Sequence, residues 1–238
     1  MQKKLGDYWN ICIFAALLLL LISSKIYHST SIEHLEKIRK AAENIKAEHL
    51  NADKVYFANE VLTDNNVLPI YSKLCMVLDI YGVRHEIAKE TEIQCCKAYK
   101  PTWLAESGIM ADHIESIVRY IGNNRVLMTN CAEYDTKFAA TLKETFESDG
   151  YEVVELSFST CEGKRNRKDM SWAYINYIQT SKVVIVPMQR IEEDKEALKQ
   201  IKAFFPDLAV VGVYAQPFFS DEGDFICYSK SIQDNSMS

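Results

Sequence analysis

His113 and Cys227 are the two residues of this chain whose types and spacing best suit catalysis. They lie at equivalent positions of a unit that repeats about every 57 residues, with Met170 between them. In a repeat architecture, equivalent positions of successive units lie on the same rim. A thiolate is a nucleophile, and an imidazole can transfer the protons of its reaction. The register therefore predicts that a nucleophile and an acid/base group meet at one end of the fold.

The repeat itself is a pattern of β-branched or aromatic strands and amphipathic helices, separated by turn residues. It predicts an α/β protein in which small modules are arranged around an axis. A third, less regular copy precedes the two clear ones, which gives about three modules. The predicted strands are 54–59, 83–88, 114–121, 125–129, 151–158, 172–178, 182–187 and 208–214, and the predicted helices are 69–81, 135–148 and 192–205.

Composition excludes several classes of function. The formal net charge is −6, which disfavours nucleic acid as a partner. The seven cysteines form no CxxC pair, and no phosphate-binding loop or zinc-ligand spacing occurs. We therefore expect no cofactor, no metal site and mostly free thiols, because a domain with this much apolar sequence needs no disulfide framework.

The N-terminus predicts a membrane anchor. Ile11–Ile22 is an unbroken apolar run, and Tyr8–Tyr27 is about as long as a bilayer requires. The basic start favours a single-pass protein with a cytoplasmic N-terminus. The alternative is a cleaved signal peptide and a secreted product, although no clear cleavage site follows. The predicted division is an anchor over 1–27, a helical stalk over 28–43, an α/β repeat domain over 44–232 and a tail over 233–238.

The residues around the pair resemble those of a known family. Asp112-His113-Ile114-Glu115 resembles the Gly-His-x-Asp stretch of agmatine deiminases and bacterial peptidyl-arginine deiminases. Gly223-Asp224-Phe225-Ile226-Cys227 is similar to the glycine-rich segment that ends in their nucleophilic cysteine. The resemblance covers roughly residues 44–232. It implies a pentein-like fold, a propeller of ββαβ modules, of which this chain would form a part.

The resemblance also implies roles for these residues. Cys227 would be the nucleophile, His113 the general acid/base and Glu115 the catalytic carboxylate that holds the guanidinium. Asp112, Gly223 and Asp224 would bind substrate. The implied substrate is a guanidino small molecule or an arginine side chain, because paired carboxylates orient a planar cation.

Several departures from the family pattern predict impaired catalysis. Only one glycine remains in Asp221-Glu222-Gly223-Asp224, Ile226 replaces a histidine, and Glu115 is one methylene longer than the family's aspartate. About two of five modules are missing, so exposed edges could pair in a homo-oligomer. Three hypotheses remain: a weakly active deiminase, a non-catalytic module that binds a ligand or a protein, and an unrelated α/β domain whose histidine and cysteine fall in register by chance.

Overall fold

A computed structural model of the chain describes residues 50–88, 117–133, 136–158, 174–215 and 225–233, apart from the side chains of Glu60, Cys131, Ile226 and Cys227. The chain divides into two units, 1–40 and 41–238, and every described residue belongs to the second. The predicted anchor, the stalk and nearly all of the tail lie outside the described residues. Among the residues that are described, no helix is long and apolar enough to cross a bilayer.

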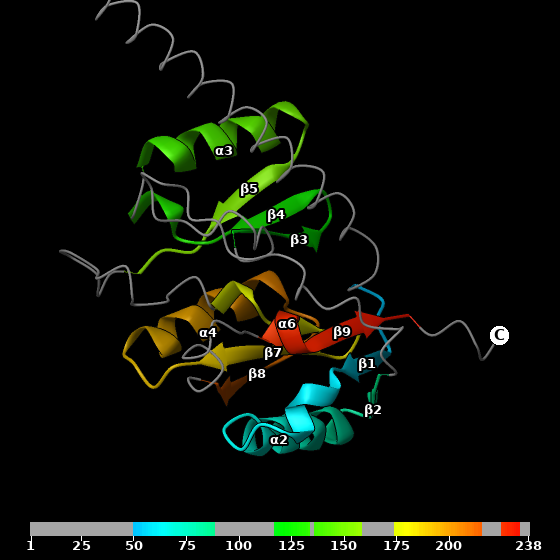
Figure 1. Cartoon of the computed structure of the whole chain (residues 1–238). Coiled ribbons are helices and arrows are strands. Elements are labelled where there is room, and N and C mark those ends of the chain that lie inside the picture. The colour runs from blue at the N-terminus through cyan, green and yellow to red at the C-terminus, as the bar shows by residue number, and fades with distance from the viewer. Residues whose placement is uncertain (1–49, 89–116, 134–135, 159–173, 216–224, 234–238) are drawn as a thin grey trace, which may run out of the picture. The chain divides into compact units, whose positions relative to one another are not determined.

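The described part is a mixed α/β fold with three small sheets, each of three strands (Figure 1). In all three, the central strand is antiparallel to one neighbour and parallel to the other, and one helix joins the parallel pair. The strand orders are β3-β4-β5, β6-β7-β8 and β9-β1-β2, and the helices that join their parallel strands are α3, α4 and α2, respectively. The bounds are β1 Lys54–Phe57, α2 Leu68–Ile80, β2 Arg84–Ile87, β3 Val118–Gly122, β4 Arg125–Met128, α3 Thr136–Ser148, β5 Glu152–Glu155, β6 Ile178–Gln179, β7 Val183–Met188, α4 Glu193–Phe204, β8 Ala209–Tyr214 and β9 Ser229–Ile232, with 3-10 turns η1 Asn59–Leu62 and η4 Cys131–Glu133 and a short helix α6 Phe225–Tyr228.

The third module takes its first strand from the other end of the chain. β9 lies beside β1, with Phe57 opposite Ser229 and Lys54 opposite Ile232. β9 is antiparallel to the central strand β1, as β3 is to β4 and β6 is to β7. The predicted third copy lacked a first strand, and the structure supplies it from residues after Cys227. This circular arrangement brings Cys227 into the module that begins the described chain.

Most predicted elements are confirmed, because their hydrophobic periods were clear. The predicted strand over 172–178 is wrong in its described part. Tyr174 and Ile175 form a helical turn, and only Ile178 of the predicted range lies in β6. Tyr174 leaves the strand direction because its hydroxyl donates to the carboxylate of Asp194 at 2.7 Å. A tertiary hydrogen bond therefore overrides local strand propensity here.

The β3–β4 hairpin shows how local sequence sets the module. Asn123 and Asn124 have φ angles of 51° and 58°, the left-handed values of a two-residue hairpin turn. Asparagine tolerates this region better than most residues. In the β6–β7 hairpin the N–H of Thr180 donates to the carbonyl of Val183 at 3.0 Å, so that two residues again lie within the turn, although three separate the strands as bounded.

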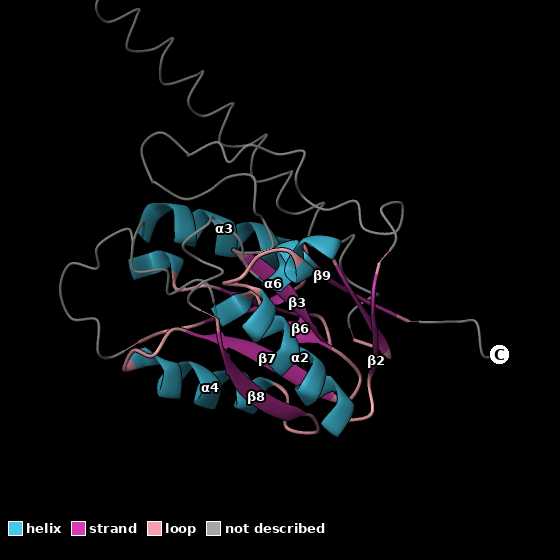
Figure 2. Ribbon diagram, turned by 60° about the horizontal axis from the view of Figure 1, so that its bottom comes forward, coloured by secondary structure: helices cyan, strands magenta, loops and turns pink. Residues whose placement is uncertain are grey.

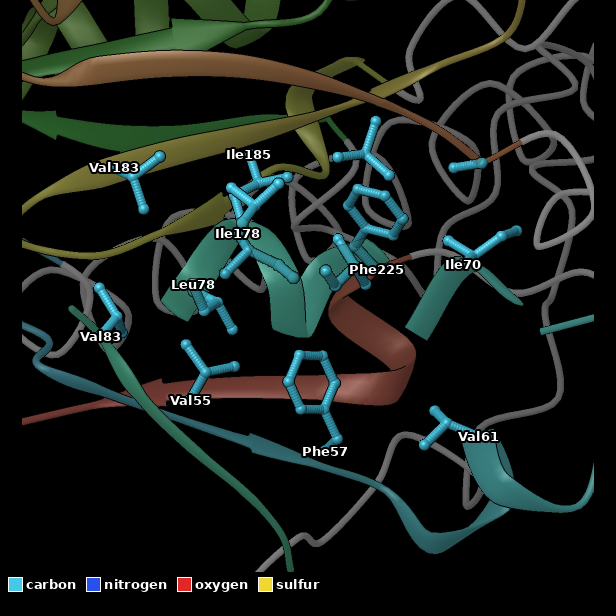
Figure 3. Close-up of a cluster of buried hydrophobic side chains, with 14 of the residues drawn as sticks. Val55, Phe57, Val61, Ile70, Leu78, Val83, Ile178, Val183, Ile185 and Phe225 are labelled. Atoms are coloured by element: carbon cyan, nitrogen blue, oxygen red, sulfur yellow. The ribbon is translucent and has the colours of Figure 1, made fainter. Parts of the chain in front are cut away.

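Two hydrophobic clusters join the modules. In each, one helix lies between its own sheet and a neighbouring sheet. The α4 cluster places Ala197 and Ile201 of α4 against Val184 of its own sheet and Leu127 of β4. The α2 cluster places Leu78 of α2 against Val55 of its own sheet and Val183 of β7, as Figure 3 shows. Its buried members are Val55, Phe57, Val61, Val67, Ile70, Leu74, Val77, Leu78, Val83, Ile178, Val183, Ile185, Val213, Ala215 and Phe225.

Candidate functional site

The backbone of Cys227 lies in α6, at the start of β9 and next to the carboxyl end of β1. The carbonyl of Tyr228 accepts the N–H of Ala58 at 2.9 Å, which joins the two segments. The hydroxyl of Ser229 donates to the carbonyl of Phe225 at 2.6 Å and closes the turn. The apolar residues here would by themselves favour a strand, but the structure has a helical turn.

Phe225 anchors this turn in the core. It is 1% exposed and belongs to the α2 cluster. Figure 3 shows its ring among side chains from different modules, with Phe57 of β1 and Ile185 of β7 drawn nearby. The ring lies two residues before Cys227, so burial of one side chain holds the position of the backbone that carries the thiol. Burying an aromatic side chain of this size contributes about 2–3 kcal/mol.

The other predicted site residues lie outside the described residues but adjoin described strand ends. Asp112, His113 and Glu115 come just before Ile117, whose carbonyl accepts the N–H of Thr129 at 2.9 Å after β4. Gly223 and Asp224 come directly before α6. Every predicted site residue thus precedes the first strand of its module. The meeting of His113 with Cys227 stays a prediction.

The strand ladders refine the repeat spacing. The carbonyls of Asn124 and Lys182 accept the N–H groups of Glu152 and Ala209, which begin the last strand of their sheets. Asn124 and Lys182, directly before the central strands, are 58 residues apart, one more than the sequence pattern indicated, whereas Glu152 and Ala209 are 57 residues apart, as it indicated. The faces of the central strands agree with a spacing of 58 residues, which makes Leu127 equivalent to Ile185. Leu127 packs on the helix of the next module, and so do Val183 and Ile185, because alternate residues of a strand share a face.

The same ladders shift the alignment of the first strands. Val55 and Val126 occupy the same place in their central strands, and their partners are Ser231 and Tyr120. These partners are 111 residues apart, whereas His113 and Cys227 are 114 apart. This comparison ends with the strands themselves, because Cys227 lies in α6, before β9, and residues 112–116 lie outside the described residues.

Arg119 is a buried cation that ties β3 to the segment before β6. Its side chain donates to the carbonyls of Ile175 at 3.2 Å and Tyr177 at 2.5 Å. Its guanidinium lies 4.0 Å from the centre of the Tyr177 ring. Burial raises the pKa of Tyr177 to about 12, while the arginine charge lowers it. Sequence reasoning missed this contact; the signal was an arginine inside an apolar strand.

Two carboxylates organise the connection after β4, at the same edge of the sheet. Glu133 accepts the side-chain amide of Asn130 at 2.8 Å and the N–H of Phe158 at 3.3 Å. Glu155 accepts the N–H of Ala132 at 2.9 Å. Burial raises the pKa of Glu155. Both carboxylates bond protein groups, and within the described ranges no cluster of His, Cys, Asp and Glu could hold a metal ion.

Comparison with known proteins gives one match to a family. The sequence pattern of a family described as Porphyromonas-type peptidyl-arginine deiminase matches residues 84–232, well over half of the chain. A Lactococcus lactis subsp. lactis (strain IL1403) protein named "Putative agmatine deiminase" is 34% identical over 79 residues, 32% of this chain and 22% of that protein.

Solved structures of agmatine deiminases are similar at lower levels. The C. jejuni enzyme is 16% identical, with a TM-score of 0.42, over 80% of this chain and 55% of that one. The Enterococcus faecalis enzyme is 16% identical, with a TM-score of 0.41, over 79% of this chain and 56% of that one. The chain therefore spans about half the length of these enzymes.

Proposed function

Because the chain belongs to the Porphyromonas-type peptidyl-arginine deiminase family, we propose that it binds a guanidino group and hydrolyses it slowly through Cys227. The family match, which spans both His113 and Cys227, carries this proposal. The relatives named agmatine deiminase point to agmatine as the first substrate to test. A peptidyl arginine is the second, from the description of the family.

The proposed reaction is substitution at the guanidinium carbon. The Cys227 thiolate attacks that carbon and forms a C–S bond, and one amino group leaves as ammonia after it takes a proton from His113. Water then attacks the same carbon, gives its proton to His113, and the C–S bond breaks. The products are a ureido compound and ammonia, and the thiolate is restored.

The remaining predicted residues would hold the substrate. Glu115 and Asp112 supply carboxylates, which match the charge and the planar donors of a guanidinium. Gly223 and Asp224 precede Cys227 and would border the bound group. The cation would in turn favour the thiolate form of the cysteine.

We further propose that the three modules form part of a pentein-like propeller. Two observations support it: Arg119 joins β3 to the start of β6, and β6 contacts β9. The first strands of successive modules are therefore neighbours. Such an arrangement would bring the segments before them, which carry the predicted site residues, toward one axis.

Slow turnover follows from the departures in the site. Glu115 is one methylene longer than the family's aspartate and only one glycine remains in Asp221–Asp224, and a misplacement of about 1 Å can reduce a rate on the order of a hundredfold. The second candidate function is a non-catalytic module that binds a guanidino ligand or a protein, and the same sequence departures favour it. In both cases we propose attachment to the membrane through residues 8–27, with secretion after signal cleavage as the alternative.

The test is an assay of the full chain in detergent for ureido product and ammonia. Agmatine, free arginine and an arginine-containing peptide are the substrates, and Cys227→Ala is compared with the native chain. Cys75→Ala is the matched control, because Cys75 is a half-buried free thiol on α2. Turnover that Cys227→Ala abolishes and Cys75→Ala retains supports the enzyme. Absence of turnover, together with saturable agmatine binding in calorimetry, supports the binding module; absence of both refutes the proposal.

A further inference from the structure

The three sheets differ in the charge of their outer edge strands. β2 carries Arg84, His85 and Glu86, and β5 begins with Glu152 and ends with Glu155. β8 reads AVVGVY, and is both longer than these two and without a charged residue or a proline. Charged residues on an edge strand discourage pairing with another strand. Two sister edges are thus protected and β8 is not.

The backbone of β8 has hydrogen-bonding groups that face outward. The N–H of Ala209 donates at 3.3 Å to the carbonyl of Lys182, directly before β7, and that of Ala215 donates at 2.9 Å to Met188 of β7, so alternate residues from Ala209 onward bond inward. Val210 and Gly212 direct their N–H and C=O groups to the open edge, where no described residue pairs with them. Gly212 is exposed. Such a row of unpaired groups is a template for an added strand.

The helix beside this edge also has an apolar outer face. α2 contacts β8, and Figure 2 shows this helix next to β7 and β8. Met76 and Ile80 on the outer face of α2 are 57% and 71% exposed. Neither α3 nor α4 has an exposed large apolar side chain among its residues. The helix that contacts β8 therefore carries exposed apolar side chains that α3 and α4 lack.

We propose that β8 is the contact through which two copies of this chain associate. The two β8 strands run antiparallel about a two-fold axis and join two three-stranded sheets into one of six strands. A two-fold contact applies the same patch on both sides, so it closes at the dimer instead of growing into a fibre. No charge on β8 opposes self-pairing. The proposal does not depend on catalysis.

The apolar face of α2 contributes to the same interface. A two-fold axis through the centre of β8, perpendicular to the sheet, places both α2 helices on one side of the joined sheet. A six-residue strand is only about 20 Å long, and a stable interface buries about 800 Å² per partner. Strand pairing alone falls short of that area. Met76 and Ile80 of both copies supply part of the remainder.

The test uses a proline at an outward-facing position of β8 and the same change in a sister sheet. Val210→Pro removes an N–H that the fold does not use and blocks pairing at the edge. Val153→Pro is the matched control, because Val153 pairs with Val126 as Val210 pairs with Val184. Sedimentation velocity of the full chain in detergent measures the protein mass, and thermal melts check that both variants fold.

The expected result is a dimer for the native chain and for Val153→Pro, and a dissociation constant raised at least about tenfold in Val210→Pro. Ile80→Asp, at a side chain exposed in one copy, should also weaken the dimer about tenfold without a change in melting temperature. A native chain that is monomeric at all concentrations overturns the proposal and leaves β8 to a strand from a different protein. Equal effects of the two proline variants, or no effect of Ile80→Asp, also overturn it.

Discussion

Replacing Arg119 by leucine tests whether one buried cation holds neighbouring modules together. The change removes two hydrogen bonds, to the carbonyls of Ile175 and Tyr177, and the contact with the Tyr177 ring. A hydrogen bond to a charged group contributes about 1.5–3 kcal/mol and a cation–π contact about 0.5–2 kcal/mol. Removing the charge also ends its desolvation cost, which offsets part of that sum. We therefore expect a net loss of about 3 kcal/mol.

That loss is large enough to measure by thermal unfolding. For a protein of 238 residues, about 1 kcal/mol lowers the melting temperature by roughly 2–4 °C, so Arg119→Leu should melt roughly 6–12 °C lower. Circular dichroism of the full chain in detergent gives the value. Arg119→Lys retains the charge but not the planar fork of donors, and its melting temperature should lie between those of the native chain and Arg119→Leu.

The matched control is Arg125→Leu, in the next strand. Arg125 is half-buried, and its side chain makes no hydrogen bond or ion pair to a described residue. Its replacement should change the free energy of unfolding by less than about 0.5 kcal/mol. If Arg119→Leu has an equally small effect, or if Arg125→Leu costs as much, the proposed role of Arg119 between modules is refuted.

Three further predictions concern side chains away from the predicted site. Gly212→Ala should destabilise the fold by about 1–3 kcal/mol in chemical denaturation, because the added Cβ would lie 2.8 Å from Cγ of Met188; an unchanged midpoint would refute this packing. Glu155→Gln should raise the melting temperature at pH 7 but not at pH 4. Burial raises the pKa of the Glu155 carboxyl above its usual 4.5 in the folded protein. The stability that the protonated carboxyl contributes is therefore present below pH 4.5 and is lost as the pH rises through the folded-state pKa. An equal gain in melting temperature at pH 4 and at pH 7 would contradict this prediction. Cys75 should be alkylated slowly at pH 8 in mass-spectrometric mapping, since burial raises its pKa above 9.0, and labelling as fast as glutathione would show otherwise.

The candidate site was predictable from sequence in part. The repeat placed Cys227 at the start of a module, and the structure has its backbone at the start of β9. The helical turn around it was not predictable, because the burial of Phe225 and the bond from Ser229 both depend on contacts of the folded chain. The repeat spacing was one residue too short for the central strands but not for the last strands, because the connection through α4 is one residue shorter than the connection through α3, which the hydrophobic pattern does not show.

The sequence by itself determined the elements and their order within two modules, because strand and helix periods are local properties that each segment shows on its own. Tertiary structure decided which strand completes the third module. β9 pairs with β1 across most of the chain, and no local pattern in Ser229–Ile232 names its partner. Tertiary structure also decided that Arg119 is buried, because the carbonyls that accept hydrogen bonds from its guanidinium belong to Ile175 and Tyr177 of the next module. Contacts between segments distant in sequence depend on the packing of all modules together, and one segment read alone does not contain them.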